Sequence, residues 1–386
     1  MQGPTYSPKE LLARLVSFDT TSHLSNMGIV RFIEDYLAQH GVASQLVPTP
    51  DGAKASLYAT IGPKTAGGVA LSGHTDVVPV NVADWTVPPF VLTERDGRLY
   101  GRGAADMKGF LACVLAAVPA FAQRRLARPV HIAFSYDEEI GCVGVRPMIG
   151  ELGRSLPKPD LVVVGEPTSM AVVDAHKGPI RWQVKVNGLA AHSSMSPLGV
   201  NAIHFAARLI GELQRIEAAL MRAPRDDRFL PPHATLQVTE IRGGTAANIV
   251  PVACGFGFEI RALPGLDVAG IEQRIRTFIE TECLPDMQRI APHAGIDLVQ
   301  TNSVPPFAAS PGSAAVALAL RLAEQNETHA VSYATEAGLF QDAGVHSVVC
   351  GPGDIAQAHT ADEWIAVSEL DRCMAFLTRL GDWAEA

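Results

Sequence analysis

Hydrophobic and polar positions follow two different patterns along the chain. In the outer parts, short apolar runs end at turn residues and alternate with stretches that have the periodicity of a helix. The apolar runs predict buried strands at residues 69–71, 130–136, 161–164 and 345–350. The periodic stretches predict helices at residues 29–40, 109–125, 313–325 and 368–380. This alternation is typical of βα units around a buried, largely parallel sheet.

Local signals mark where several helices begin or end. Ser7 and Glu10 form a capping box and Pro8 suits the first helical position, so a helix is predicted to begin here. Gly41 predicts the end of the helix at 29–40. Pro119 lies inside the stretch 109–125 and predicts a kink or an early stop.

In the middle of the chain, apolar and polar residues alternate with a period of two, which predicts strands with one exposed face. The apolar positions are Trp182, Val184 and Val186 in one strand and Cys254, Phe256, Phe258 and Ile260 in another. A helix with the apolar stripe Ile203, Ala207, Ile210 and Leu213 lies between them, and a second helix is predicted at 267–278. We therefore expect an inserted domain at residues 180–289, with residues 1–179 and 290–386 forming an α/β domain.

Composition and charge narrow the class of protein. Of the 386 residues, 47% are hydrophobic and 18% are charged, which supports a full core. The formal net charge of −9 argues against nucleic acid or an anionic membrane as the main partner. The longest apolar run, residues 110–123, is too short to span a bilayer, and we expect no secretory signal. The six cysteines form no CxxC pair, which predicts buried thiols and a cytoplasmic location.

Acidic residues and histidines gather directly after the predicted strands. His74 and Asp76 follow the strand at 69–71, an Asp-Glu-Glu run at 137–139 follows the strand at 130–136, and Glu166 follows the strand at 161–164. Asp106 ends a glycine-rich turn before a helix, and His359 lies in the loop after 345–350. Each residue alone has an ordinary explanation, such as a helix cap, a solvated strand end or a buried histidine.

Taken together, these residues indicate a metal site. Ligand sites in open α/β sheets form beyond the carboxyl ends of the strands, so these side chains are expected to converge. Converging carboxylates repel one another and need a cation. Two imidazoles with three or four carboxylates suit two zinc-type ions that share a bridging aspartate. The sequence has no GxSxG elbow, no Walker A loop and no HExxH pair, so other common hydrolytic and phosphate-binding chemistries have no comparable signal.

Several segments also resemble a known family. They are SGHTDVVP at 72–79, YGRGAADMKG at 100–109, DEEIG at 137–141 and GEPT at 165–168. In order and spacing they are similar to the M20 family of di-zinc aminoacylases and peptidases over nearly the whole chain. The resemblance implies a zinc-aminopeptidase-like catalytic domain with a mixed, mostly parallel sheet. It also implies that the inserted domain is an α+β lid and dimerisation domain, an antiparallel sheet with two helices.

The resemblance assigns roles to the residues at the strand ends. It implies two zinc ions per chain, with cobalt as a possible substitute. One ion would be held by His74 and Glu166, and the other by Glu139 and His359. Asp106 would bridge the two ions and be followed by a cis peptide bond to Met107.

The same family implies the catalytic roles. Glu138 would be the general base and acid that acts on a zinc-bridged water, and Asp76 would orient His74. Glu138 and Glu139 can serve different roles only if the backbone bends there, and Gly141 makes a bend plausible. His192 would stabilise the oxyanion from the lid of the opposite subunit, which predicts a homodimer.

Further motifs concern the substrate, a small N-acyl amino acid. Residues 176–178, 191–194, 242–251 and 332–338 resemble one group within the family, and this resemblance implies hydrolysis of N2-acetyl-L-ornithine to L-ornithine and acetate, in arginine synthesis. The resemblance places Arg261 on the substrate carboxylate, with a cross-strand ion pair to an acid among the neighbours of Glu259 as the alternative. Asn248 and Gly353 are positional candidates for substrate contact.

Other interpretations stay open at this point. Ala104-Ala105 resembles enzymes that act on N-succinyl-diaminopimelate, and His359-Thr360-Ala361-Asp362-Glu363 differs from the His-Lys-Pro-Asp-Glu common in the deacetylating group. Another N-acyl amino acid is therefore the alternative substrate. A metal-binding or interaction module without catalysis would be expected to lack the base or a ligand, and this chain has both.

Overall fold

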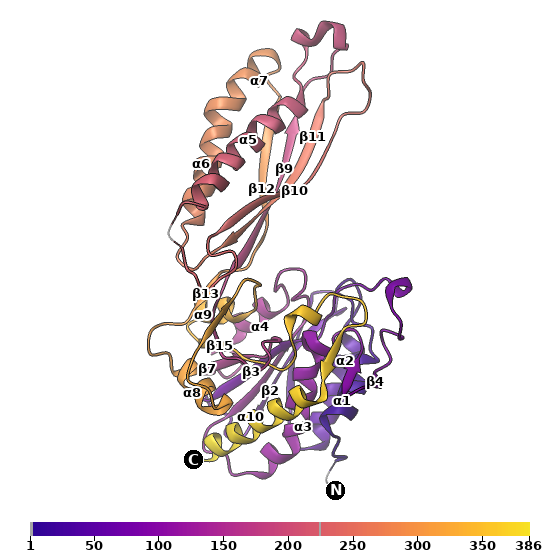
Figure 1. Cartoon of the computed structure of the whole chain (residues 1–386), viewed down its shortest axis with the longest axis vertical. Helices are drawn as coiled ribbons and strands as arrows, with labels where there is room; N and C mark the ends of the chain where they lie inside the picture. Colours follow the sequence, from indigo (N-terminus) through magenta and orange to yellow (C-terminus); the bar gives the residue numbers. More distant parts are fainter. Residues whose placement is uncertain (1–2, 224) are drawn as a thin grey trace. The chain divides into compact units, whose positions relative to one another are not determined.

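The computed structural model describes residues 3–223 and 225–386, and the chain divides into two compact units (Figure 1). The first unit contains the residues up to Ala175 together with Phe307–Ala330 and Thr335–Ala386. The second unit contains His176–Pro306 and Val331–Ala334. Each unit is described separately below.

The first unit is built on a mixed sheet with the strand order β1-β2-β6-β3-β7-β15-β8-β13, and β14 pairs with β8. The strands are β1 (Ser44–Pro48), β2 (Ala55–Ile61), β3 (Val69–His74), β6 (Val130–Ser135), β7 (Leu161–Val164), β8 (Val173–His176), β13 (Phe307–Ala308), β14 (His329–Val331) and β15 (His346–Val349). The central strands β6, β3, β7 and β15 are parallel, whereas β1, β2 and β8 pair antiparallel with their neighbours. The predicted mixed, mostly parallel α/β fold is confirmed.

The helices of this unit are α1 (Pro8–Val16), α2 (Met27–Gln39), α3 (Gly109–Gln123), α4 (Val145–Glu151), α8 (Ala314–Ala323), α9 (Ala337–Asp342) and α10 (Val367–Glu385). A small sheet, β16-β5-β4, joins β16 (Trp364–Ala366), β5 (Arg98–Tyr100) and β4 (Thr93–Arg95). The core contains the buried faces of α1, α2, α3, α8 and α10 and the buried residues of the central strands. Central strands buried on both faces explain the uninterrupted apolar runs in the sequence.

The predicted helix signals fit most of these elements. Ser7 caps α1, and its capping box with Glu10 is present. Gly41 has a φ of 74° two residues after α2 ends. Of the two outcomes predicted at Pro119, a kink or an early stop, the early stop is wrong, because α3 continues to Gln123. Packing of α3 against α1 and α10 outweighs the loss of one backbone donor at proline.

One helical stretch among the described residues, Ala104–Gln123, is long and apolar enough to span a membrane by composition alone. It is longer than the run predicted from the sequence because it includes the turn Ala104–Lys108 before α3, in which Asp106 and Met107 have non-helical backbone angles. Of its most apolar window, 89% is buried inside the protein. The apolar character of this stretch therefore follows from its place in the core.

The second unit is an antiparallel sheet with the order β10-β11-β9-β12, and its helices lie along one face of it (Figure 1). The strands are β9 (Gly178–Asn187), β10 (Thr235–Gly243), β11 (Ala253–Ala262) and β12 (Gly295–Ser303), and the helices are α5 (Ala202–Leu220), α6 (Val268–Phe278) and α7 (Leu284–Ile290). Buried and exposed residues alternate along most of β9, as the sequence predicted. The stacked rings of Trp182 and Phe258 join β9 to β11 on the covered face.

Two predictions for this unit were wrong in detail. The inserted domain does not end at residue 289, because β12 pairs with β9 in the same sheet. Residues beyond the second amphipathic helix show no clear strand pattern, since Leu298 is the one buried residue of β12. The apolar stripe of α5 is also displaced: Ala206 and Leu209 are buried, whereas Ala207 is exposed. The buried face of α5 is therefore rotated from the predicted one. Alanines lie on both sides of the predicted stripe, and because alanine fits both the core and the surface, they do not indicate which side is buried.

Candidate metal centre

The centre lies where the central strands of the first unit end. In the parallel register, His74 at the end of β3 is opposite Ser135 at the end of β6. Glu166 follows β7, the neighbour of β3 on its other side. His74 and Glu166 are far apart in the sequence, yet each lies at or just after the carboxyl end of a strand of the same sheet.

Asp106 reaches the same place from the turn Ala104–Lys108 (η2), which precedes α3 and in which Asp106 and Met107 have non-helical backbone angles. Gly103 begins this turn with a φ of 79°, and a Cβ there would be 2.7 Å from Val77. Glycine is required here because a side chain has neither the backbone freedom nor the space. The peptide bond between Asp106 and Met107 is cis, as the family resemblance implied.

The carboxylate of Asp106 lies between the two histidines. Its Oδ1 is 3.1 Å from Nε2 of His74, and its Oδ2 is 3.3 Å from Nε2 of His359. His359 Nε2 is also 3.0 Å from Oε2 of Glu139, and His74 Nε2 is 3.9 Å from Oε1 of Glu166. Each oxygen of one aspartate therefore faces a different imidazole and carboxylate pair, which is the arrangement expected of a bridging ligand.

The donor atoms are also close enough for metal binding. One group of ligand atoms lies within 4.8 Å of one another in His74, Asp106 and Glu139, and another in His74, Glu138 and Glu166. Within the described residues, Oε1 of Glu139 and Oε1 of Glu166 are buried without a hydrogen-bond partner. Buried carboxylate oxygens are costly when unpaired, so the donor set fits divalent cations.

The electrostatics of the cluster support the same fit. Burial, with repulsion from Glu139 and Asp106, raises the pKa of Glu138 to about 8. Burial, with repulsion from Asp106, raises the pKa of Glu139 to about 7 and that of Glu166 well above its ordinary value. Because positive charge at this point would favour the ionised carboxylates, a cation would relieve the repulsion that these shifts report.

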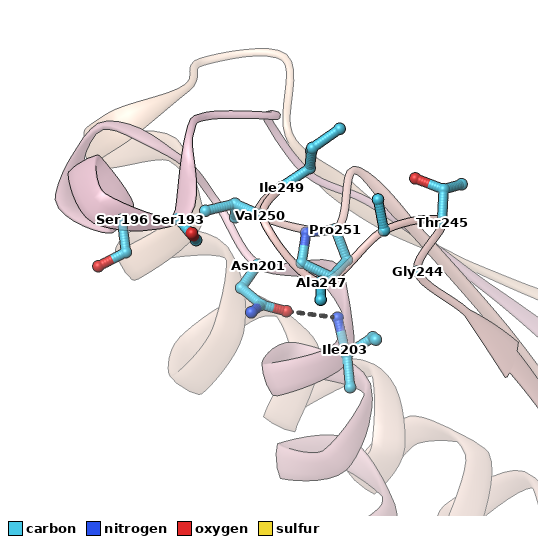
Figure 2. A pocket seen from close by; sticks show the side chains of 11 residues that line it. Ser193, Ser196, Asn201, Ile203, Gly244, Thr245, Ala247, Ile249, Val250 and Pro251 are labelled. Carbon is cyan, nitrogen blue, oxygen red and sulfur yellow. Dashed lines mark hydrogen bonds between the residues drawn. The ribbon is translucent and has the colours of Figure 1, made fainter.

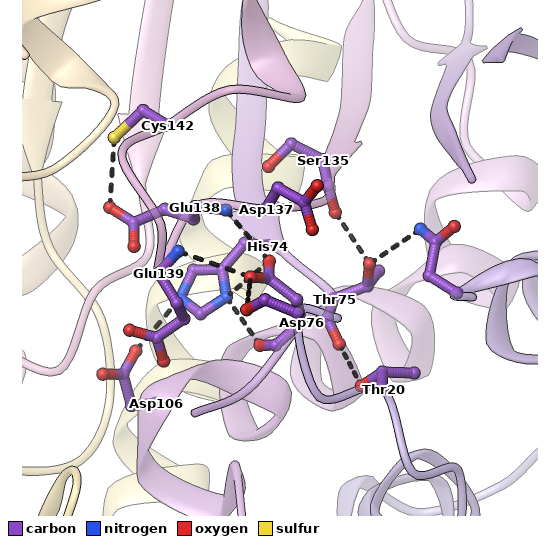
Figure 3. Close-up of polar contacts among 12 residues, drawn as sticks. Thr20, His74, Thr75, Asp76, Asp106, Ser135, Asp137, Glu138, Glu139 and Cys142 are labelled. Atoms are coloured by element: carbon purple, nitrogen blue, oxygen red, sulfur yellow. Dashed lines mark hydrogen bonds and ion pairs between the residues drawn. The ribbon is translucent and has the colours of Figure 1, made fainter. Parts of the chain in front are cut away.

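Asp76 connects the end of β3 to the acidic turn after β6. Nδ1 of His74 lies 2.9 Å from the backbone oxygen of Asp76 and 3.5 Å from its carboxylate, so the main contact that orients the imidazole is the carbonyl. The carboxylate instead accepts hydrogen bonds from the backbone N–H groups of Glu138 and Glu139, at 3.1 and 3.3 Å, and from Ser22 Oγ (Figure 3). Asp76 therefore positions the residues after β6 as well as His74.

The backbone bend that separates Glu138 from Glu139 begins at Asp137, which has a φ of 55°, and Gly141 follows with a φ of 116°. Asp137 is fixed by an ion pair with Lys54 at 2.5 Å. Glu139 points toward Asp106, whereas Oε1 of Glu138 accepts a hydrogen bond from the thiol of Cys142 (Figure 3). Adjacent acids are thereby given different surroundings.

Glu336 is a buried residue near the centre to which the sequence assigned no role. It is 1% exposed, and its carboxylate accepts hydrogen bonds from Ser72 Oγ, at 3.0 Å, and from Ser135 Oγ. These serines stand on β3 and β6, the strands that carry His74 and the acidic turn. Glu336 lies in the segment 332–338 that the resemblance included, but neither hydrophobic pattern nor spacing indicates that it joins two strands.

His192, Asn248 and Arg261 belong to the second unit. His192 is exposed and its Nδ1 lies 2.7 Å from Ser194 Oγ, while the backbone oxygen of Asn248 accepts from Ser193 at 2.9 Å. The adjoining loops line a pocket of about 520 Å³ (Figure 2). Residues around this pocket include Ser193, Ser196, Asn201, Thr245, Ile249 and Val250.

Arg261 takes part in an ion pair along its own strand. Its Nε is 2.5 Å from Oε1 of Glu259, and the other oxygen of Glu259 is 2.6 Å from Nε of Arg181 on β9. The partner of Arg261 is thus Glu259 itself, on the same strand, and not an acid across the sheet as the alternative from the sequence had it. The pair uses Nε of Arg261, while bidentate recognition of a carboxylate needs two N–H groups of the guanidinium.

Gly353 belongs to the first unit and packs beside the turn that contains Asp106. Its backbone N–H donates to Glu369 at 3.1 Å and its oxygen accepts from Ser169 at 2.6 Å. A Cβ at this position would lie 3.3 Å from Cβ of Ala105, and the φ is 90°. The structure therefore gives Gly353 a packing role next to Asp106.

Comparison with known proteins identifies the family. Residues 70–382 match the family described as peptidase family M20/M25/M40. The chain belongs to this family. As an M20 chain it is a hydrolase, and the matched range contains all the predicted residues of the metal centre.

Relatives of this M20 chain include proteins named acetylornithine deacetylase. One from Myxococcus xanthus is 36% identical over 374 residues, covering 95% of each chain. Another from Yersinia pseudotuberculosis is 33% identical over 369 residues, covering 94% of this chain and 92% of the relative. One from Pasteurella multocida is 32% identical over 366 residues, covering 94% and 93%. The likeness extends through both units.

Solved structures agree with the fold. The aminopeptidase PepT from Bacillus cereus has a TM-score of 0.76 at 19% identity and covers 98% of each chain. An M20 family metallo-carboxypeptidase from Sulfolobus solfataricus has a TM-score of 0.75 at 18% identity, covering 98% of this chain and 99% of the other. A dinuclear metal binding peptidase of the M20 family from Bacillus subtilis has a TM-score of 0.65 at 17% identity, covering 97% and 98%.

Proposed function

We propose that this chain hydrolyses the amide bond of N2-acetyl-L-ornithine to L-ornithine and acetate, as a step of arginine synthesis in the cytoplasm. The observation that carries the proposal is the carboxylate of Asp106, which faces His74 with one oxygen and His359 with the other. The proteins named acetylornithine deacetylase, which match over nearly the full length, support the choice of substrate. The buried state of all six cysteine thiols suits a reducing compartment.

The cofactor in this proposal is a pair of zinc ions per chain, for which cobalt could substitute. His74 and Glu166 would hold one ion, Glu139 and His359 the other, and Asp106 would bridge them. When bound, the two ions polarise the amide carbonyl and lower the pKa of a water molecule at the centre. The unpaired buried oxygens of Glu139 and Glu166 support this assignment.

Glu138 acts as the general base. Its carboxylate lies near the donor atoms of His74 and Glu166, yet its hydrogen bond to Cys142 keeps one oxygen away from a purely ligating role. Glu138 accepts a proton from the attacking water and later donates it to the leaving amine, which is the ordinary task of one carboxyl group in amide hydrolysis. Asp76 holds the backbone of Glu138 in place for both steps.

The second unit contributes substrate binding and, in a homodimer, completes the site. His192 donates to the developing oxyanion of the partner's substrate, and Arg261 binds the α-carboxylate, with Asn248 as a further contact and Gly353 of the first unit as another. Exposed apolar side chains on the loops near His192 support an interface at this unit: Met195, Leu198, Ile249 and Val252. Where exposed apolar side chains form a contiguous patch, they often mark a protein–protein contact.

A substrate panel tests the proposal. Purified enzyme, loaded with zinc, would be given N2-acetyl-L-ornithine, N-acetyl-L-glutamate, N-acetyl-L-methionine and N-succinyl-L,L-diaminopimelate, with release of the free amine measured directly. We expect the highest kcat/KM with N2-acetyl-L-ornithine. The Ala104-Ala105 pair favours the succinylated substrate as the second candidate. Faster turnover of that substrate would overturn the assignment, while no turnover of any amide would remove the catalytic proposal altogether.

A further inference from the structure

Glu363 is a buried acid that the catalytic scheme does not use. It lies directly before β16, four positions after His359 in the sequence, and is 1% exposed. Its carboxylate accepts hydrogen bonds from the segment that carries Asp106. The donors are Nη1 of Arg102 at 2.7 Å, the backbone N of Gly103 at 2.9 Å, the backbone N of Ala105 at 2.9 Å and the backbone N of Asp106 at 3.0 Å.

The two carboxylate oxygens of Glu363 divide the donors of this turn between them. Oε2 receives Arg102 and Gly103, and Oε1 receives Ala105 and Asp106. An ionised carboxylate is an acceptor at every lone pair, so it can satisfy all these donors at once. The backbone oxygen of Glu363 also accepts from Gly101 at 2.9 Å, which extends the contact to the start of the turn.

The two histidines of the centre depend on this contact to different degrees. His74 is the last residue of a buried strand, so the sheet fixes its backbone. His359 lies in a loop, with a φ of 60° and a side chain that is 53% exposed. Glu363 ties the chain just after His359 to the backbone N–H of Asp106 itself, and so fixes the two ligands relative to each other.

We propose that Glu363 is a positioning residue that sets the spacing of His359 and Asp106 and thereby determines occupancy of the metal position formed by Glu139, Asp106 and His359. The inference rests on the proposed function in that it assumes two ions per chain. The position formed by His74, Glu166 and the shared Asp106 depends less on Glu363, because His74 and Glu166 are held by strands of the sheet whereas His359 lies in a loop.

The test compares Glu363→Gln with Asp362→Asn. In Glu363→Gln, an NH2 group replaces one acceptor oxygen, so one pair of donors on the turn faces another donor. Asp362 is the neighbouring acid and accepts from the backbone N and Oγ1 of Thr86 instead, so Asp362→Asn makes the same chemical change outside the turn that carries Asp106. Zinc content per chain would be measured by mass spectrometry after dialysis, and zinc affinity by competition with a chromophoric chelator.

We expect wild type and Asp362→Asn to retain two zinc ions, and Glu363→Gln to retain one. The weaker ion should bind about 10- to 100-fold less tightly, the range found when partners of metal ligands are removed. Raising the zinc concentration should restore both the second ion and the activity of Glu363→Gln, which a general loss of folding would not allow.

Two ions bound with unchanged affinity in Glu363→Gln would overturn the inference and leave the proposed function standing. Equal weakening of both ions would also overturn it, because the effect would not be specific to the position of His359. If Glu363→Gln does not fold, Glu363→Asp provides the same comparison. It keeps the charge that pairs with Arg102 but is one methylene shorter, so the same selective loss is expected and its absence would contradict the proposal.

Discussion

Glu138 and Glu139 are neighbours in the sequence and yet have separate surroundings, because the backbone turns at Asp137. Asp137 has a φ in the left-handed region, where aspartate is among the better-tolerated residues. The turn is stabilised from outside by Lys54 on Asp137 and by Asp76 on the two backbone N–H groups. A local bend therefore permits one acid to bind metal while the other remains available for proton transfer.

Removing the charge of Glu138 tests this separation. We expect Glu138→Gln to lower kcat by about 10²- to 10⁴-fold, the usual contribution of a general base. Zinc content should stay at the wild-type value, because the ligands are other residues. Measurement of kcat together with metal content decides the point: loss of an ion with the activity would make Glu138 a ligand instead.

His176 provides a pH prediction away from the metal centre. Burial lowers its pKa to about 4, although hydrogen bonds to backbone groups act in the opposite direction. The unfolded chain therefore binds a proton at higher pH than the folded chain, and the free energy of unfolding falls as the pH drops from about 6.5 to 4. We expect a slope of about 1 kcal/mol per pH unit from this residue.

Urea unfolding of the chelator-treated protein at several pH values would measure this slope. The variant His176→Gln has no ionisable group at this position and should lose that part of the pH dependence. All other titratable groups are the same in both proteins, so the difference between the two slopes belongs to His176. An identical slope in wild type and variant would contradict the lowered pKa.

At the scale of the elements, the sequence predicts well which residues lie at the strand ends. It does not predict which side chains form hydrogen bonds between the strands. His74, Asp106, Glu139, Glu166 and His359 could be found because each follows an apolar run or a glycine-rich turn. Hydrophobic patterns predict which residues are buried, but they do not predict which groups a buried polar side chain binds. The links made by Glu336 across β3 and β6, like those of Asp76, join residues far apart in the chain, so nothing local indicates them.

The errors in the second unit have a similar cause. β12 is an edge strand with few buried residues, so its alternation is weak and the domain boundary was placed too early. The face of α5 was misplaced because alanine fits both the core and the surface. Where a large residue fixed the pattern, as Trp182 does in β9, the predicted face is the one observed.

On β11, Arg261 lies beside an acid of its own strand, and mutation can test whether it also binds substrate. Glu259 and Arg261 share a face because they are two residues apart, and Arg181 approaches the same acid from β9. We expect Arg261→Lys to raise KM for N2-acetyl-L-ornithine by about tenfold or more with a smaller change in kcat, because lysine lacks the planar pair of donors. Arg181→Lys is the matched control, since it contacts the same Glu259.

Steady-state kinetics of both variants would separate the two roles of Arg261. An unchanged KM in Arg261→Lys would assign this residue to the ion pair with Glu259 alone. Equal increases in both variants would show that Glu259, and not a contact between Arg261 and substrate, determines the effect.

At the scale of the whole molecule, the division into two units predicts two thermal responses. Each unit has its own sheet and buried apolar face, and the proposed ligands all lie in the first. Ligand binding stabilises only the folded unit that contains the site, by about 2.7 kcal/mol at a hundredfold excess over Kd. We expect a chelator to lower the Tm of one calorimetric transition and leave the other in place.

Scanning calorimetry with and without chelator would follow both transitions, and restored zinc should reverse the change. If the chelator lowered the Tm of the whole unfolding profile by the same amount, the two units would unfold as one, contrary to this expectation. A chelator without effect on any transition would count against tightly bound metal.

The proposed exchange of His192 between subunits gives a prediction about mixed dimers. Glu138→Gln and His192→Ala should each be nearly inactive alone. A dimer with one subunit of each kind has one site with both residues intact, so an equal mixture should recover up to about a quarter of wild-type activity. Subunit exchange after mild denaturation, followed by an assay, would detect it, and no recovery would place His192 in its own subunit's site.

The strand order of the first unit has a consequence for how the chain is made. β15, which lies between β7 and β8 in the sheet, comes from near the C-terminus, after the whole of β9 to β12. During translation, the antiparallel unit is nearly complete before the ribosome reaches this strand. Since domains fold as units while they are synthesised, we expect the inserted unit to fold first. His74, Asp106 and Glu166 can form the complete centre only after β15 and His359 have been synthesised.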